Sequence, residues 1–157
     1  MTLLDAPKYD PAHDRKIRNL LIAAGVSIVL IAVIGVGGFF AGHGWFFDNL
    51  GIEHRVSTFL KAVQSNDLDR AYGIWLNDPE WKQHPQNPNY DFKRFSADWG
   101  PQSEDGPLRT YKVEISKRTG TGCIIQTQIN DKPKRLFLWY QISTQKLSFS
   151  PLELSTL

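Results

Sequence analysis

Residues 19–42 read N-L-L-I-A-A-G-V-S-I-V-L-I-A-V-I-G-V-G-G-F-F-A-G and contain no acidic residue, no basic residue and no proline. In a helix that rises about 1.5 Å per residue, roughly 20 residues cross the ~30 Å hydrocarbon core of a bilayer. The run is apolar on every side, whereas a buried helix of a soluble domain usually has a polar face. The stretch therefore predicts a transmembrane helix, with the lipid bilayer as its first partner.

The basic residues beside this run indicate its direction. Lys8, Arg15, Lys16 and Arg18 precede the run, and Arg55 is the only base within a similar distance after it. Lysine and arginine next to a span are retained on the cytoplasmic side. We therefore expect residues 1–18 to form a short, largely unstructured cytoplasmic stub and the C-terminal part to lie outside.

A cleaved secretory signal is the alternative to an anchor, because it also has a basic start and an apolar middle. Signal peptides have apolar regions of about 7–15 residues and end in an A-x-A-like site. The small residues near the end of this longer run form no such site: Gly35, Gly37, Gly38 and Ala41. We expect an uncleaved single-pass anchor, placed in a bacterial inner (plasma) membrane with a periplasmic domain.

Composition excludes several classes of function. Four of the 18 lysines and arginines and three of the 16 acids precede the span, so neither side carries the basic patch that nucleic acid requires. Cys123 is the only cysteine, which excludes a disulfide within the chain and a cysteine-based metal cluster. The histidines have no metal-ligand spacing, so we expect neither a metal nor a cofactor.

Small and aromatic residues at the outer end of the span suggest contacts there. Gly35, Gly38 and Gly42 are spaced so that a second helix can approach closely, from another membrane-complex subunit or a homodimer mate. Residues 43–50 form a juxtamembrane linker in which Trp45, Phe46 and Phe47 mark the outer interface, or begin the core of the outer domain.

Residues 51–157 are long enough for one compact outer domain. Apolar residues at helical spacing predict helices over residues 51–64, 68–76 and 91–99, with Asn66 or Asp67 capping the second. Prolines at 79, 85 and 88 exclude a long helix or a central strand from residues 77–90.

From Leu108 onward the apolar residues alternate with polar ones, which is typical of strands. Tyr111, Val113 and Ile115 are predicted to share one face, and short turns near residues 119–122, 130–133 and 143–146 separate four strands. Helices followed by an antiparallel meander give an α+β fold.

The segment V-S-T-F-L-K-A-V-Q-S-N-D-L-D-R-A-Y, residues 56–72, resembles the opening of the nuclear transport factor 2-like superfamily. That resemblance covers about two-thirds of the chain and implies a cystatin-like roll, in which two to three helices pack on a four-stranded curved sheet. Members usually place a strand between the second and third helices, where this chain has its proline-rich segment. Small bacterial proteins with one span and such a roll outside include secretion scaffold subunits and transport-associated membrane proteins.

Catalytic residues are not expected. Asp98 beside Trp99 resembles a carboxylate in an apolar pocket, but helical spacing turns it away from the apolar face. His84 lies in a loop, and no nucleophile or phosphate-binding motif is present. A roll of this kind has a cavity, and aromatic residues would line it as a possible ligand pocket: Tyr72, Trp75, Trp81 and Trp99.

The strand over residues 134–142 carries large aromatics on both faces. Phe137 and Trp139, with Arg135, point away from the core and need a cover. A C-terminal segment containing Leu152 and Leu154 is one candidate for that cover. The other is a partner subunit, since tryptophan and phenylalanine beside arginine are typical of interfaces.

Two functions follow from these patterns. The first is a non-catalytic accessory, scaffold or assembly subunit that contacts a membrane complex through its helix and its outer domain. The second is a membrane-tethered binding module that holds a small apolar or aromatic ligand in the roll.

Overall fold

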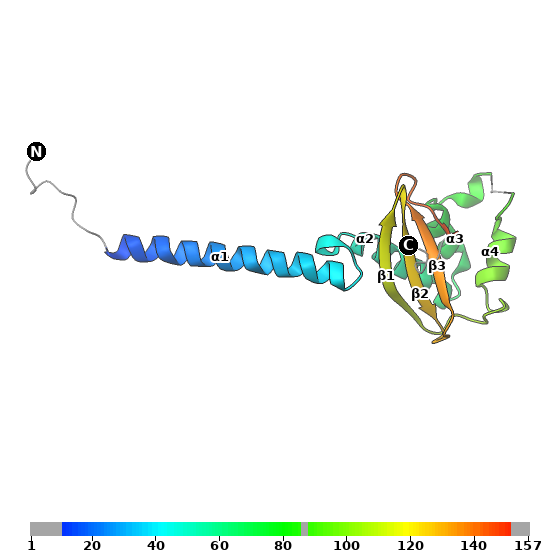
Figure 1. Cartoon of the computed structure of the whole chain (residues 1–157). Helices are drawn as coiled ribbons and strands as arrows, with labels where there is room; N and C mark the ends of the chain where they lie inside the picture. The colour runs from blue at the N-terminus through cyan, green and yellow to red at the C-terminus, as the bar shows by residue number, and fades with distance from the viewer. Residues whose placement is uncertain (1–10, 86–87, 152–157) are drawn as a thin grey trace, which may run out of the picture.

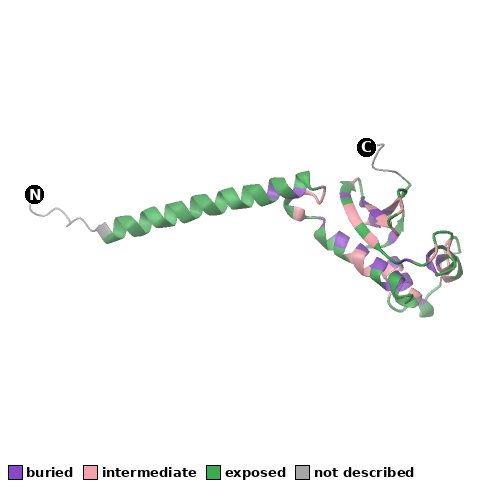
Figure 2. Cartoon of the chain, turned by 90° about the horizontal axis from the view of Figure 1, so that it is seen from below, coloured by how far each residue is buried: buried purple, intermediate pink, exposed green. Residues whose placement is uncertain are grey.

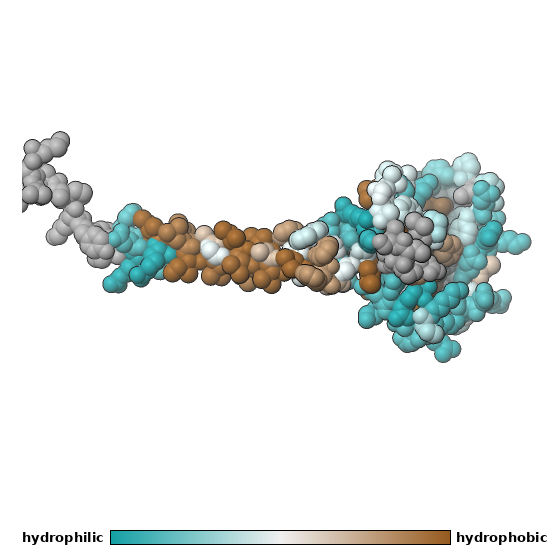
Figure 3. All heavy atoms as spheres, viewed as in Figure 1, coloured by the Kyte–Doolittle hydropathy of each residue, from teal (hydrophilic) through white to brown (hydrophobic). Residues whose placement is uncertain are grey.

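The computed structural model describes residues 11–85 and 88–151 (Figure 1). An N-terminal helix, α1 (Pro11–Phe40), projects from a domain of helices and one sheet. It is long and apolar enough to cross a membrane, and nearly all of it is exposed, unlike the mostly buried core helix of a soluble protein (Figure 2). After a hydrophilic N-terminal end, apolar side chains cover most of its length in Figure 3, as in a membrane anchor or a signal sequence.

Helix α1 begins earlier than the uncharged run. Residues 11–18 are helical, so the expected unstructured stub is wrong for that part, and residues 1–10 lie outside the described residues. Pro11 suits a first helical position, because its missing N–H would have no partner there. The helix therefore begins about two turns before the apolar run and includes the charged residues Asp14, Arg15, Lys16 and Arg18.

The three predicted helices of the outer domain are confirmed as α2 (Leu50–Gln64), α3 (Leu68–Leu76) and α4 (Phe92–Trp99). Asp67 caps α3, and Asp91 caps α4 by accepting a hydrogen bond from the backbone N–H of Arg94 at 2.8 Å. Such caps satisfy N–H groups that have no partner within the helix. Between α3 and α4, the described residues contain one short 3₁₀ turn, η3 (Trp81–Gln83), and no strand.

The four predicted strands are also confirmed, and they form an antiparallel sheet in the order of the sequence. They are β1 (Tyr111–Thr119), β2 (Gly122–Ile129), β3 (Arg135–Gln141) and β4 (Leu147–Phe149). The helices pack on one face of this sheet and leave the other face uncovered by helix (Figure 1).

A bulge in β1 overturns one predicted side-chain direction. Val113 pairs with Thr127 and Ile115 pairs with Gln126, so Glu114 is an extra residue in the strand. One extra residue turns every later side chain to the opposite face. Ile115 is therefore exposed on the outer face, and Ser116 is buried on the helix side.

The core lies between the helices and the inner face of the sheet. Aromatic rings fill its centre, and Phe59 contacts Trp75, Phe95 and Trp99 with ring centroids 4.9–6.2 Å apart. Ile125, Leu138 and Leu147 cover these rings from the sheet. The alternation expected for β2 and β3 thus places the correct residues in the core.

Candidate functional site

The strongest candidate site is the junction between α1 and the outer domain. After α1 the chain turns back and forms η2, a 3₁₀ turn over Trp45–Phe47. The turn lies directly against the helix because Gly38 has no side chain: a Cβ there would be 2.7 Å from the carbonyl oxygen of Gly44. One turn earlier, the ring of Phe46 rests on Gly35, where a Cβ would be 2.7 Å from its Cζ atom.

The same turn is attached to β1 through the backbone. The N–H of Ser116 donates to the carbonyl of Gly42 at 2.9 Å, which continues the hydrogen bonding of β1 onto the segment that follows α1. The side chain of Ile115, turned outward by the bulge, faces Gly42. The bulge thus gives the junction both its apolar contact and its buried hydroxyl.

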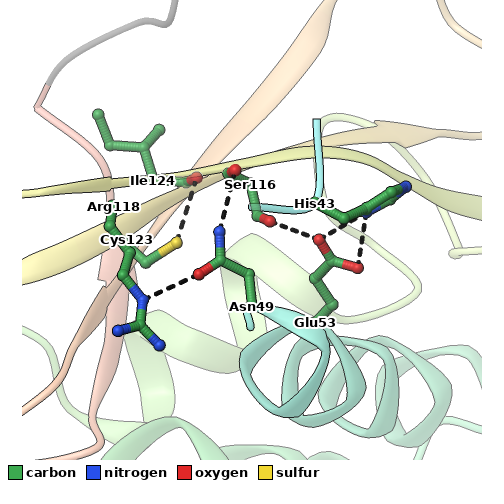
Figure 4. Close-up of polar contacts among 7 residues, drawn as sticks. All are labelled: His43, Asn49, Glu53, Ser116, Arg118, Cys123 and Ile124. Carbon is green, nitrogen blue, oxygen red and sulfur yellow. Dashed lines mark hydrogen bonds and ion pairs between the residues drawn. The ribbon is translucent and has the colours of Figure 1, made fainter. Parts of the chain in front are cut away.

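A buried carboxylate lies at the centre of the junction (Figure 4). Glu53, only 8% exposed, comes from the first turns of α2 and accepts a short hydrogen bond from the Ser116 hydroxyl of β1. The Nδ1 atom of His43 lies 2.8 and 2.9 Å from its two carboxylate oxygens. Burying a carboxylate is costly unless it is paired, so these partners tie three segments together.

Asn49 links the same segments beside Glu53 (Figure 4). Its side-chain N–H donates to the carbonyl of Ser116 at 3.2 Å, and its oxygen accepts from Nε of Arg118 at 2.9 Å. Arg118 also donates to the backbone carbonyl of Asp48 at 3.3 Å. Asn49 is almost fully buried, so both of its polar ends are used where water is excluded.

The arrangement joins three parts of the chain. The residues come from the segment after α1, from the start of α2 and from β1, and each polar group meets a group on another segment. The sequence gives little sign of the cluster: His43 and Glu53 have no recognised spacing, and Ser116 reaches the inner face only because of the bulge.

The glycines predicted to receive a second helix have other neighbours in the structure. Gly35 and Gly38 contact Phe46 and the backbone of the turn, and Gly42, with φ +80°, contacts Ile115. The close approach that these small residues permit is real, but the chain's own turn makes it. At Gly35 and Gly38 the chain's own turn therefore occupies the space that a second helix would need.

The rings predicted to line a ligand pocket are packed against each other instead. Tyr72, Trp75, Trp81 and Trp99 are buried, with Tyr72 and Trp81 centroids 4.9 Å apart and Trp75 and Trp99 centroids 5.9 Å apart. Trp99 lines one cavity of about 210 Å³ together with Asp98, Leu108 and Phe149, and Trp81 lines a separate groove of about 680 Å³ together with Ile74 and Pro79. The first volume is below the ~300–1,000 Å³ of typical small-molecule pockets and the second lies within that range, but each is lined by only one of the four rings.

The residues predicted for a partner interface do share the outer face of the sheet. Phe137 and Trp139 are half-buried there, and Ile124, which pairs with Trp139, is fully buried between them and β1. Arg135 pairs with Glu114 at 2.6 Å, and hydrogen bonds from Gln126 and Arg135 lower the pKa of that carboxyl. Leu152 and Leu154, the alternative cover, lie outside the described residues.

The remaining candidates show no catalytic arrangement. His84 pairs with Asp78 at 2.6 Å on the surface, and this bond lowers the pKa of Asp78. Burial raises the pKa of the Cys123 thiol to about 11, so it stays protonated at neutral pH. Within the described residues, no group of three or more His, Cys, Asp or Glu side chains could hold a metal ion.

Burial, followed by the nearby Asp98 carboxylate, raises the pKa of Tyr90 well above its usual range. Asp98 therefore acts here as a neighbour of a buried phenol, at the edge of the aromatic core.

Comparisons of the chain with protein-family models, with curated proteins and with solved structures found no match.

Proposed function

We propose that this protein is a single-pass, non-catalytic accessory subunit of a membrane complex, with its N-terminus inside and its domain held at the outer membrane surface. The observation that carries the proposal is the junction. A flexible tether requires no buried carboxylate, whereas here Glu53 and Asn49 join the end of the span to α2 and β1. Such a junction fixes the direction in which the domain presents its other surfaces.

The outer face of the sheet is the surface that we propose for the partner. Two half-buried aromatics, Phe137 and Trp139, lie beside Arg135 on a face without helices. Interfaces concentrate their binding energy in aromatic and arginine residues of this kind. The partner is another subunit of the complex or a second copy of this chain.

The proposed kinship with the nuclear transport factor 2-like superfamily rests on the order of elements. Two helices, an irregular segment, a short helix and a four-stranded meander occur as that fold implies. The absence of a strand from the described part of residues 77–90 is the main difference. The aromatic residues that fill the core favour an interaction role over a ligand-binding one.

Replacing Trp139 with alanine tests the interaction role. We expect the variant, purified from the native membrane in mild detergent, to lose at least about tenfold in partner affinity, as hot-spot tryptophans do. Phe92→Ala is the matched control, because Phe92 is also a half-buried aromatic but lies on α4 and contacts Trp81 with ring centroids 4.7 Å apart. Affinity is measured by titration of the purified partner.

Unfolding midpoints of both variants separate binding from stability. The proposal predicts that Trp139→Ala loses its partner while remaining folded, and that Phe92→Ala keeps it. Unchanged stoichiometry and affinity for a folded Trp139→Ala would contradict the assigned interface.

A further inference from the structure

We propose that η2 re-enters the outer half of the bilayer beside α1, and that Phe46 contacts lipid acyl chains at the depth of Gly35. This inference rests on the proposed anchoring by α1. It adds a second membrane-embedded element to the chain. The partner is the hydrocarbon of the outer leaflet, to which this short turn would fasten the domain.

The position of Phe46 along α1 gives its depth. Its ring rests on Gly35, where a Cβ would approach three ring atoms within 2.7–3.0 Å. Five residues separate Gly35 from the last helical residue, Phe40, which is a rise of roughly 7 Å. A helix needs about 20 residues to cross the hydrocarbon core, and about 20 residues counted from the one after Arg18 end near Phe39. Gly35 therefore lies inside the hydrocarbon region.

The outward surface of the turn is apolar and continuous with α1. Phe46 is 56% exposed and Phe40 is 82% exposed, and Trp45 stacks on Phe39 with ring centroids 4.9 Å apart. The charged and polar groups of the junction face the domain instead, where Glu53 meets Ser116 of β1 and Asn49 meets Arg118 of β1 (Figure 4). The exposed surface of the turn beside α1 is therefore aromatic, while Asp48, which follows the turn, pairs with Arg118 at 3.7 Å.

Four backbone N–H groups in and beside the turn are paired within the chain, and an embedded segment needs such pairing because the bilayer core offers no partners. His43 N–H donates to the carbonyl of Gly38 at 3.0 Å, and Asp48 N–H donates to that of Trp45 at 3.0 Å. Phe47 N–H donates to Gly44 at 3.3 Å, and Asn49 N–H donates to His43 at 3.3 Å.

The turn also contains two residues in an unfavourable backbone conformation, which contacts with α1 stabilise. Phe46 and Phe47 have φ of 53° and 55°, in the left-handed region that bulky residues rarely adopt. Such conformations persist where the surroundings compensate for them. The packing of two aromatic rings, Phe46 on Gly35 and Phe47 on Gly38, is the compensation that we identify.

Spin labels on the full-length chain in vesicles test the depth. In a Cys123→Ala background, single cysteines replace Phe46, Val36 as a lipid-exposed reference in α1, or Lys93 as an aqueous reference in α4. The vesicles contain equal parts of phosphatidylglycerol and phosphatidylcholine. Accessibility to oxygen reports lipid, and accessibility to a water-soluble nickel complex reports water.

We expect position 46 to match position 36, with nickel accessibility several-fold below that at position 93. Trp45→Cys, which leaves Phe46 in place, should give an intermediate value and keeps the test open if Phe46→Cys misfolds. Values at 45 and 46 equal to that at 93 would overturn the inference. Low accessibility to both reagents would also overturn it, in favour of a protein partner over Phe46.

The Val36 reference separates this inference from the proposed anchoring. If position 36 is itself accessible to the nickel complex, then α1 does not cross the bilayer and both proposals fail. If position 36 lies in lipid and position 46 in water, only the re-entrant turn fails.

Discussion

Gly122 is a residue at which one added carbon atom has a large predicted effect. A Cβ at this position would lie 2.1 Å from Cζ2 of Trp139 and 2.6 Å from the carbonyl oxygen of Tyr140. The indole of Trp139 therefore lies flat over a strand residue without a side chain, and its Nε1 donates to Gln141 at 3.0 Å. Gly122 thus sets the position of the aromatic face that we assign to the partner.

We predict that Gly122→Ala lowers the free energy of unfolding by about 1–3 kcal/mol, because overpacking forces both neighbours to move. Gly51→Ala is the matched control, since nothing lies within 4 Å of a Cβ there and alanine favours a helix. Urea unfolding of the full chain in detergent measures both. Equal stability of the two variants would contradict the close packing of Trp139 on Gly122.

Glu114 makes a pH-dependent contribution to stability. Hydrogen bonds from Gln126, and then from Arg135, lower its pKa in the folded protein below the ordinary 4.5. A depressed carboxyl pKa stabilises the folded state above the unfolded-state pKa, and the gain is lost as pH falls through the folded-state pKa. Glu114→Gln should therefore lower the melting temperature at neutral pH, and this difference should disappear in acid.

Melting curves from neutral pH to below pH 4 check this prediction, with the exposed Glu104→Gln as control. A Glu114→Gln difference that stays constant across the range would show that the ionised carboxylate contributes nothing. The control should match the wild type at every pH.

Side-chain directions could be predicted only where the strand is regular. Cys123 and Ile125, two residues apart, both lie in the core because β2 pairs with β3 in an unbroken register. Ile115 and Ser116 exchange faces because Glu114 is an extra residue, and alternation alone contains no sign of it. The junction cluster depends on that exchange, so sequence reasoning could not find it.

At the scale of elements, the cap of α4 supports a short helix that carries two core aromatics. Asp91 accepts from the N–H of Arg94 at 2.8 Å, and α4 buries Phe95 and Trp99. We predict that Asp91→Ala costs about 0.5–2 kcal/mol of stability. Lys93→Ala, an exposed change in the same helix, should stay within about 0.5 kcal/mol of wild type.

Thermal unfolding of the two variants measures the cap. A cost for Asp91→Ala no larger than that of Lys93→Ala would mean that the cap does not hold α4 in place. Asp91→Asn should retain most of the stability, because asparagine caps nearly as well.

The helices and strands themselves were accessible from the sequence because their periodicity is strong and their ends carry recognisable signals. Asp67 and Asp91 are capping residues, and the predicted turns lie where the strands end. The turn η2 was not accessible, because its left-handed Phe46 and Phe47 contradict the preferences of phenylalanine. Its conformation depends on contacts with α1 and β1 that form only in the fold.

At the scale of the whole molecule, several contacts join α1 to the domain that follows it. The turn packs on Gly35 and Gly38, the backbone of β1 continues onto Gly42, and Glu53 is paired at the centre. The central claim is that this junction fixes the domain relative to the helix.

Pulsed electron–electron spin resonance between labels on α1 and α4 tests that claim most directly. Labels replace Leu30 and Lys93, both exposed, in the full-length Cys123→Ala chain in vesicles. We predict one narrow distance distribution, which broadens in Glu53→Ala because Ser116 and His43 lose their shared partner. A broad distribution in the otherwise unchanged chain would show a flexible tether and contradict the account.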